Sequence, residues 1–188
     1  MMRPFFLIGY MGCGKTTFGR SLAKALGCRF VDLDFYIEQR FRKSIKEIFA
    51  ERGEDGFRRL EGNMLREVGE FSDVVIACGG GTPCFGGNMD YMNEKGITVL
   101  LQAETEVLME RCRLRPGKRP LLAGKTDGEL REFILSHLVE REPFYSRARL
   151  SLESSRLENR QEIDETVKRF LSREDVGSMI QKNRENCC

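Results

Sequence analysis

The sequence lacks a long apolar run, a paired-cysteine motif and an excess of charge of one sign. No stretch approaches the about 18 apolar residues that a helix needs to cross a bilayer, so we expect no membrane contact. The 31 basic and 29 acidic residues give a net charge of only +2, which argues against a nucleic acid partner. The seven cysteines are odd in number and contain no C-x-x-C pair, which favours a reducing cytoplasm.

The composition that remains is that of one globular domain. Hydrophobic residues make up 40% of the 188 and charged residues 32%, and no repeat or low-complexity segment interrupts them. We expect a single domain over residues 1–173, a flexible C-terminal tail over residues 174–188, and a monomer.

Short β-type runs alternate with helical stretches along the chain. Phe5 to Ile8 form a continuous apolar run, which is typical of a strand buried on both faces. Further strands are predicted at residues 30–33, 73–77, 97–101 and 150–152, and a closing helix at about 159–172. Strands separated by helices predict an α/β fold, a three-layer αβα arrangement around a five-stranded parallel sheet.

Two segments break this alternation. Residues 34–70 hold two or three helices where one would suffice, and residues 112–126 are basic and rich in proline and glycine. We interpret the first segment as a helical substrate-binding insert and the second as a mobile lid.

The turn after the first strand carries the most specific motif. Residues 9–16, GYMGCGKT, match G-x-x-x-x-G-K-[ST] between a buried strand and a helix start, and so form a P-loop. Lys15 would contact the β- and γ-phosphates, and the Thr16 hydroxyl would ligate Mg²⁺. The expected phosphate-binding residues are Gly12, Cys13, Gly14, Lys15, Thr16 and Thr17. This motif predicts a nucleoside triphosphate with magnesium.

Two aspartates, Asp32 and Asp34, end the second predicted strand. The carboxyl ends of strands face the ligand in a doubly wound sheet, and period-two alternation would place both side chains on one side. One carboxylate would then hold the Mg²⁺ shell while the other accepts a proton from a substrate hydroxyl. The alternative is that Asp34 only caps the helix that follows.

Two arginines lie in helical patterns that suggest anion binding. Arg58 precedes Glu61 by three residues, so the carboxylate can orient the guanidinium, or the pair is a plain surface salt bridge. Arg141 falls in step with Leu130 and Ile134 on the inward face of its helix, where an arginine needs an anionic partner. Together the two arginines are suited to grip a small carboxylate, although spacing alone leaves this open.

Two loop features complete the candidate set. Three glycines at residues 79–81 follow the third strand, where their backbone can approach a ligand closely or form a simple turn. Arg119 lies in the predicted lid, from which it can swing onto phosphates or remain solvated.

Taken together, these motifs resemble the shikimate kinase family over residues 1–172. The resemblance rests on ordered motifs at residues 9–16, 32–34, 44–61, 79–81 and 119–122, completed by Arg141 with Tyr145. It implies transfer of the γ-phosphoryl group of ATP to the 3-hydroxyl of shikimate, with Mg²⁺, on the route to aromatic amino acids.

The resemblance also implies residue roles. Asp34 would bind ring hydroxyls and act as the base, and Asp32 would reach Mg²⁺ through water. Arg119 would close over the phosphates. The expected shikimate-binding residues are Asp34, Arg58, Glu61, Gly79, Gly80, Gly81 and Arg141, with Glu61 orienting Arg58.

Two arginines are candidates for the contact with adenine. Arg111 and Arg113 both lie near the position of the arginine that stacks on adenine in this family, and Arg156 would approach the far side of the base.

Three other functions share some of these motifs. A gluconate or nucleoside monophosphate kinase shares the sheet, P-loop and lid, but the set of Asp34, Arg58 and Arg141 argues against it. A GTP-dependent switch needs an N-K-x-D motif, and the sequence has no Asn-Lys dipeptide. A relative that binds nucleotide without turnover is not favoured, because every expected catalytic group is present.

Overall fold

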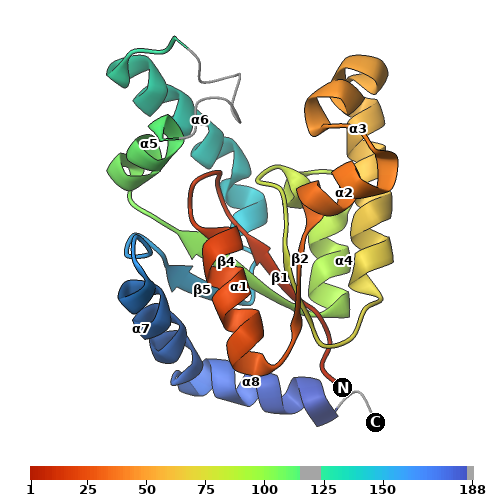
Figure 1. The fold of residues 1–188 in the computed structure, drawn as a ribbon, viewed down its shortest axis with the longest axis vertical. Coiled ribbons are helices and arrows are strands. Elements are labelled where there is room, and N and C mark those ends of the chain that lie inside the picture. Colours follow the sequence, from red (N-terminus) through yellow and green to blue (C-terminus); the bar gives the residue numbers. More distant parts are fainter. Residues whose placement is uncertain (115–123, 186–188) are drawn as a thin grey trace.

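The computed structural model describes residues 1–114 and 124–185, and its centre is a parallel sheet (Figure 1). The five strands lie in the order β2-β3-β1-β4-β5, which confirms the predicted α/β fold. The strands are β1 (Phe5–Ile8), β2 (Arg29–Asp32), β3 (Val74–Ala77), β4 (Ile97–Gln102) and β5 (Leu150–Glu153). The helices are α1 (Lys15–Leu26), α2 (Leu33–Phe41), α3 (Ile45–Gly69), α4 (Asn88–Lys95), α5 (Thr105–Arg113), α6 (Asp127–Tyr145), α7 (Arg160–Leu171) and α8 (Glu174–Glu185), with a 3-10 turn η1 (Thr82–Cys84).

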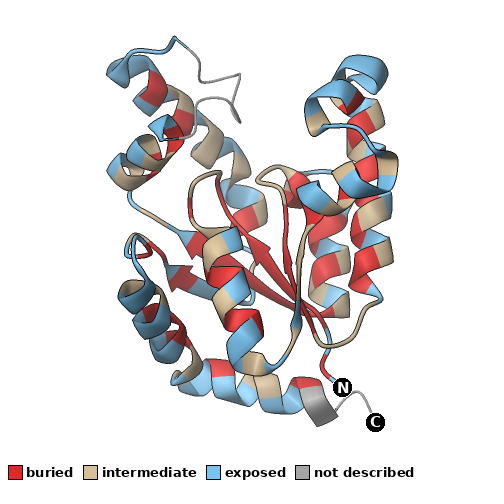
Figure 2. Cartoon of the chain, in the orientation of Figure 1, coloured by how far each residue is buried: buried red, intermediate tan, exposed pale blue. Residues whose placement is uncertain are grey.

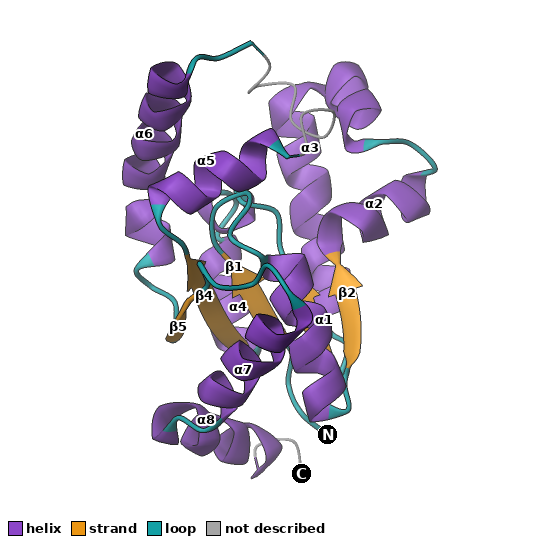
Figure 3. Cartoon of the chain, turned by 60° about the vertical axis from the view of Figure 1, so that its left-hand side comes forward, coloured by secondary structure: helices purple, strands orange, loops and turns teal. Residues whose placement is uncertain are grey.

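The central strand β1 separates two hydrophobic cores. Its side chains alternate between the faces of the sheet, so Phe5 and Leu7 pack in the core that includes α1 and α7. Phe6 and Ile8 pack in the core on the α2, α3 and α4 side. All four are 0% exposed, and the sheet forms the buried middle layer in Figure 2, with α1 and α7 in front of it in Figure 3. This arrangement is the expected three-layer fold.

Two helical regions extend past the carboxyl ends of the strands. Helices α2 and α3 lie on one side of the loop that follows β1, and α5 and α6 lie on the other (Figure 1). Helix α3 is kinked at Gly53, whose φ of 66° with ψ of −178° is open to glycine and strained for other residues. Residues 34–70 thus contain α2 and the two parts of the kinked α3, where the sequence suggested two or three helices.

The structure corrects the boundary between β2 and α2. The strand ends at Asp32, and Leu33 already begins the helix, so Asp34 lies in the first helical turn. The Asp32 carboxylate caps α2 by accepting a hydrogen bond from Phe35 N at 3.4 Å. The strand alternation predicted for Asp32 and Asp34 is therefore wrong, and the helix cap is Asp32 instead of Asp34.

The expected flexible tail is also corrected. Residues 174–185 form α8, because Val176 is fully buried in the core beside α7. The Asn183 side chain accepts a hydrogen bond from Arg3 N at 2.6 Å and donates one to Arg3 O at 3.2 Å. In the described residues, no helix combines the length and the apolar character that crossing a membrane requires.

Candidate active site

The P-loop is shaped to surround an anion at the start of α1. Gly14 caps this helix without any side-chain hydrogen bond, so its N terminus is open to a ligand. Gly9 has a φ of +134°, and a Cβ there would lie 2.3 Å from Leu101 O, so only glycine fits. The Lys15 ammonium donates to Gly9 O at 2.8 Å and to Tyr10 O at 2.9 Å, which holds it against its own loop.

Two oxygen ligands for a hard cation lie beside this loop. The Thr16 hydroxyl donates to Asp32 Oδ2 at 2.8 Å, so both oxygens are within reach of one small ion. Hydroxyl and carboxylate oxygens suit Mg²⁺, which usually binds proteins through one or two carboxylates plus substrate phosphates. Among the described residues, no three His, Cys, Asp or Glu side chains form a metal cluster. The residues present therefore fit a cation that is brought in with phosphates.

Asp34 is a carboxylic acid whose pKa lies well above its usual value. Burial of the carboxyl group, followed by the charges of Glu61 and Asp32, raises the pKa of Asp34 to about 6, against the opposite influence of Lys15. By accessible area the residue is exposed, although protein groups surround its carboxyl group on several sides. At neutral pH the carboxylate is mainly ionised.

Arg58 is held by two acids and several rings. Its guanidinium donates to Glu61 Oε2 at 2.9 Å and reaches Glu54 Oε1 at 3.5 Å. It also lies over the Phe85 ring, 4.3 Å from its centroid, with Phe57 at 5.4 Å. Glu61 itself is 1% exposed and accepts a second hydrogen bond, from Thr82 Oγ1 at 2.6 Å. The orienting role expected for Glu61 matches this geometry.

Arg141 has a different environment. Its guanidinium lies over the Tyr10 ring, with its carbon 5.1 Å from the centroid, and no acid within the described chain forms an ion pair with it. Its Nη1 is a buried donor without a hydrogen-bond partner, as is Nε of Arg58. Tyr145, one turn later, donates to Gly80 O at 2.6 Å. Unsatisfied buried donors are costly, so this geometry favours an anionic ligand.

The turn at residues 79–81 is where these side chains meet. A Cβ on Gly79 would lie 2.9 Å from Glu61 Oε1 and 3.2 Å from Asp34 Oδ1. A Cβ on Gly81 would lie 2.9 Å from Arg58 Nη2, and one on Gly80 would lie 3.0 Å from Arg141 Nη1. A Cβ on Gly80 would also lie 3.5 Å from Met11 N of the P-loop. The carboxylate, both arginines and the P-loop therefore converge on one glycine turn.

The arginines expected near adenine are separated. Arg111 donates from Nη1 to Gly12 O at 3.2 Å and from Nη2 to Ser155 O at 2.7 Å, so it lies beside the P-loop. Arg113 pairs with Asp127 at the start of α6. Arg156 is exposed in the loop before α7. Arg119 lies outside the described residues.

Comparison with known proteins decides the family. A model of the shikimate kinase family matches residues 11–172. This chain belongs to the shikimate kinase family.

Individual family members are similar to this chain in sequence and structure over most of its length. The shikimate kinase of Phocaeicola vulgatus is 52% identical over 166 residues, which are 88% of this chain and 95% of that protein. A crystal structure of shikimate kinase from Bacteroides thetaiotaomicron is 50% identical with a TM-score of 0.87, over 91% of this chain and 97% of that one. Shikimate kinase from Acinetobacter baumannii in complex with shikimate is 32% identical with a TM-score of 0.79, over 91% and 92% of the two chains.

These findings confirm the shikimate kinase prediction and make the chain an ATP-dependent phosphotransferase. The gluconate or nucleoside monophosphate kinase alternative is not favoured. A gluconokinase from Sinorhizobium meliloti, 17% identical with a TM-score of 0.57, shares the fold alone.

The sequence analysis of this shikimate kinase family member missed Thr82, Tyr10 and His137. Thr82 directly follows the glycine turn, and this position was its only signal. Tyr10 fills a variable position of the P-loop motif, and the Tyr10 hydroxyl lies 3.3 Å from His137 Nδ1 across 127 residues of sequence. No local pattern predicts such a contact.

Proposed function

We propose that the P-loop, Asp34, Arg58 and Arg141 together transfer the γ-phosphoryl group of ATP to the 3-hydroxyl of shikimate, giving shikimate 3-phosphate and ADP. The observation that carries this assignment is the glycine turn at residues 79–81, which lies against Asp34, both arginines and the P-loop. Acceptor and donor groups are thereby brought within a few ångströms, as direct in-line transfer requires.

The two arginines bind the carboxylate of shikimate. Each has a buried nitrogen without a hydrogen-bond partner, Nε in Arg58 and Nη1 in Arg141, so a carboxylate adds hydrogen bonds that the protein does not supply. Glu61 orients Arg58 from a buried position. Gly79, Gly80 and Gly81 leave room for the ring, because side chains there would clash with the groups around them.

Asp34 accepts the proton of the attacking hydroxyl. Its raised pKa of about 6 places it close to the working pH while leaving it ionised, which suits a general base. Its position next to Gly79 puts this carboxylate at the edge of the proposed ring site.

The nucleotide is held by the N terminus of α1 and the loop before it. Lys15 would exchange its carbonyl contacts for the β- and γ-phosphates, and backbone N–H groups would surround the same oxygens. The residues proposed for this role are Gly12, Cys13, Gly14, Lys15, Thr16 and Thr17. When bound, Mg²⁺ would neutralise phosphate charge, with the Thr16 hydroxyl as a ligand and Asp32 reaching it through water.

Arginines complete the nucleotide site. Arg111 already contacts the P-loop and is the better placed of the two adenine candidates, whereas Arg113 pairs with Asp127. Arg156 is proposed on the far side of the base. Arg119, within the lid of residues 112–126, is proposed to neutralise charge on the transferred group. Residues 34–70 form the substrate insert, and we propose that the protein works in the cytoplasm as a monomer.

A coupled assay of ADP release tests the assignment, with shikimate, gluconate or AMP as acceptor. Turnover is expected with shikimate alone. Lys15→Met and Asp34→Asn should each lower kcat by at least about 100-fold with the fold intact, whereas Asp55→Asn on the exposed surface of α3 should not. Near-normal kcat in Asp34→Asn would remove Asp34 as the base, and turnover with gluconate would contradict the acceptor.

A further inference from the structure

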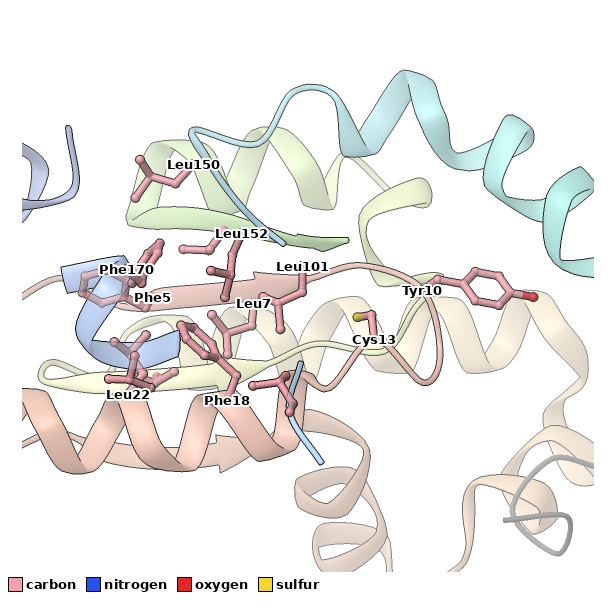
Figure 4. Packing of buried hydrophobic residues seen from close by; sticks show 14 of the residues in the cluster. Phe5, Leu7, Tyr10, Cys13, Phe18, Leu22, Leu101, Leu150, Leu152 and Phe170 are labelled. Atoms are coloured by element: carbon pink, nitrogen blue, oxygen red, sulfur yellow. The ribbon is translucent and has the colours of Figure 1, made fainter. Parts of the chain in front are cut away.

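Tyr10 belongs to the P-loop, but its ring contacts side chains of α6. The residue is 2% exposed, and Figure 4 shows its ring directed away from the other labelled side chains of the core. Its backbone oxygen accepts a hydrogen bond from the Lys15 ammonium at 2.9 Å. The backbone of Tyr10 thus belongs to the nucleotide side of the site, while its ring extends elsewhere.

The ring lies under the guanidinium of Arg141. The guanidinium carbon is 5.1 Å from the ring centroid, within the range of cation–π attraction. No carboxylate in the described residues pairs with Arg141. The cation–π contact with the Tyr10 ring is therefore a main interaction that stabilises this guanidinium from outside α6. An arginine held on an aromatic face keeps its planar fork available to a ligand.

His137 in turn fixes the Tyr10 ring. Its Nδ1 lies 3.3 Å from the Tyr10 hydroxyl, and its own ring packs on Phe133 with centroids 4.1 Å apart. His137 precedes Arg141 by one helical turn on α6, so the two side chains lie on the same face. Burial, and then the positive charge of Arg141, lower the pKa of His137, which favours the uncharged ring beside the Tyr10 hydroxyl.

We propose that Tyr10 and His137 are positioning residues that hold Arg141 in the orientation that binds the acceptor's carboxylate. The inference rests on the proposed carboxylate-binding role of Arg141. Tyr10, at a position that the P-loop motif leaves open, would then contribute to acceptor binding. A side chain without an aromatic ring would leave the Arg141 guanidinium without this contact.

Single variants give the first test, with steady-state kinetics and calorimetric shikimate binding on the full chain. Tyr10→Leu removes the ring and should raise the KM and Kd for shikimate about tenfold, the size of a desolvated cation–π contact. Tyr10→Phe keeps the ring and should raise them about threefold, the loss of one hydrogen bond. His137→Leu should match Tyr10→Phe, and the KM for ATP should change less than twofold in all three. An equal loss for ATP and shikimate would instead assign Tyr10 to general P-loop stability and overturn the proposal.

A double-mutant cycle separates this inference from the proposed function. Adding Tyr10→Leu to Arg141→Ala should have no further effect on shikimate affinity, because Tyr10 acts through Arg141. Additive losses would overturn the positioning role while leaving the arginine clamp in place. Unchanged shikimate affinity in Arg141→Ala alone would overturn the clamp, and the positioning role with it. Thermal melting of Tyr10→Phe and Tyr10→Leu shows which of them stays folded at the assay temperature.

Discussion

The two arginines proposed to bind the substrate carboxylate differ in how their charge is balanced. Arg58 is paired with Glu61 and Glu54 and lies among aromatic rings before any ligand arrives. Arg141 has the Tyr10 ring beneath it but no acidic partner within the described residues. Arg58 is therefore a compensated charge that is part of the fold, whereas Arg141 is an uncompensated charge that a ligand must neutralise.

The difference in charge compensation between Arg58 and Arg141 predicts different effects of their removal on protein stability. Removing a compensated arginine leaves a buried acid without its partner, which destabilises the protein. Removing an uncompensated arginine relieves the protein of a charge and costs mainly ligand affinity. Both substitutions should therefore weaken shikimate binding, whereas only the loss of Arg58 should also destabilise the fold.

The largest effect is expected for Arg141. Arg141→Ala should lower kcat/KM for shikimate about 100-fold or more, because it removes the charge that the ligand's carboxylate would pair with. Arg141→Lys should remain severely impaired, since lysine cannot form the forked contact. Arg147→Lys, on the exposed surface just after α6, is the matched control and should behave as the unmodified protein. Tm should not fall in Arg141→Ala, and a marked fall would contradict the comparison.

Arg58→Ala should raise the KM for shikimate and, unlike Arg141→Ala, should also lower stability. It leaves Glu61 buried at 1% exposure without its cation, and the free energy of unfolding should fall by on the order of 3 kcal/mol. Urea unfolding measures this directly, and adding Glu61→Gln should restore part of the loss. If Arg58→Ala and Arg141→Ala unfold at the same urea concentration, the distinction between the two arginines is wrong.

A change of pH tests the contribution of Asp34. Activity requires its ionised form, so kcat should fall about tenfold per unit as the pH drops below about 6. Stability should change in the opposite sense. Because folding raises this pKa from 3.8 to about 6, the folded state binds more protons between those values, and this contribution to stability is lost as the pH rises through 6. Asp34→Asn should remove that slope from the unfolding curves, and an unchanged slope would assign it to another group.

The smallest effect is expected for the orienting acid. Glu61→Gln keeps oxygen and nitrogen atoms near Thr82 and Arg58 but removes the charge that fixes the guanidinium. We expect the KM for shikimate to rise about threefold, with kcat unchanged. Glu54→Gln is the control, because that carboxylate is 62% exposed and contributes little as a surface partner. Equal KM values in the two variants would show that burial of Glu61 does not matter for binding.

Local patterns predicted most of the scaffold and the nucleotide loop. The apolar run of β1 and the glycine spacing of the P-loop each depend on consecutive residues, so both were visible in the sequence. The sequence analysis predicted a flexible tail where α8 lies. Val176, Met179 and Ile180 have helical spacing, but no recognisable motif accompanies them.

Contacts between distant residues were beyond sequence reasoning. Asp34 lies beside the glycine turn, but from the first turn of α2, since Asp32 ends the strand and caps the helix. The bond between Thr82 and Glu61 and the contact between Tyr10 and His137 span 21 and 127 residues. Only packing of the elements brings such pairs together.

The position of β1 in the sheet affects how the chain is made. This strand emerges first from the ribosome, yet its neighbours β3 and β4 begin at Val74 and Ile97. Until those residues have been synthesised, the apolar run of Phe5 to Ile8 has two unpaired backbone edges and no core to enter. A nascent chain that stalls before β4 is therefore an aggregation-prone species that needs a chaperone to shield this strand.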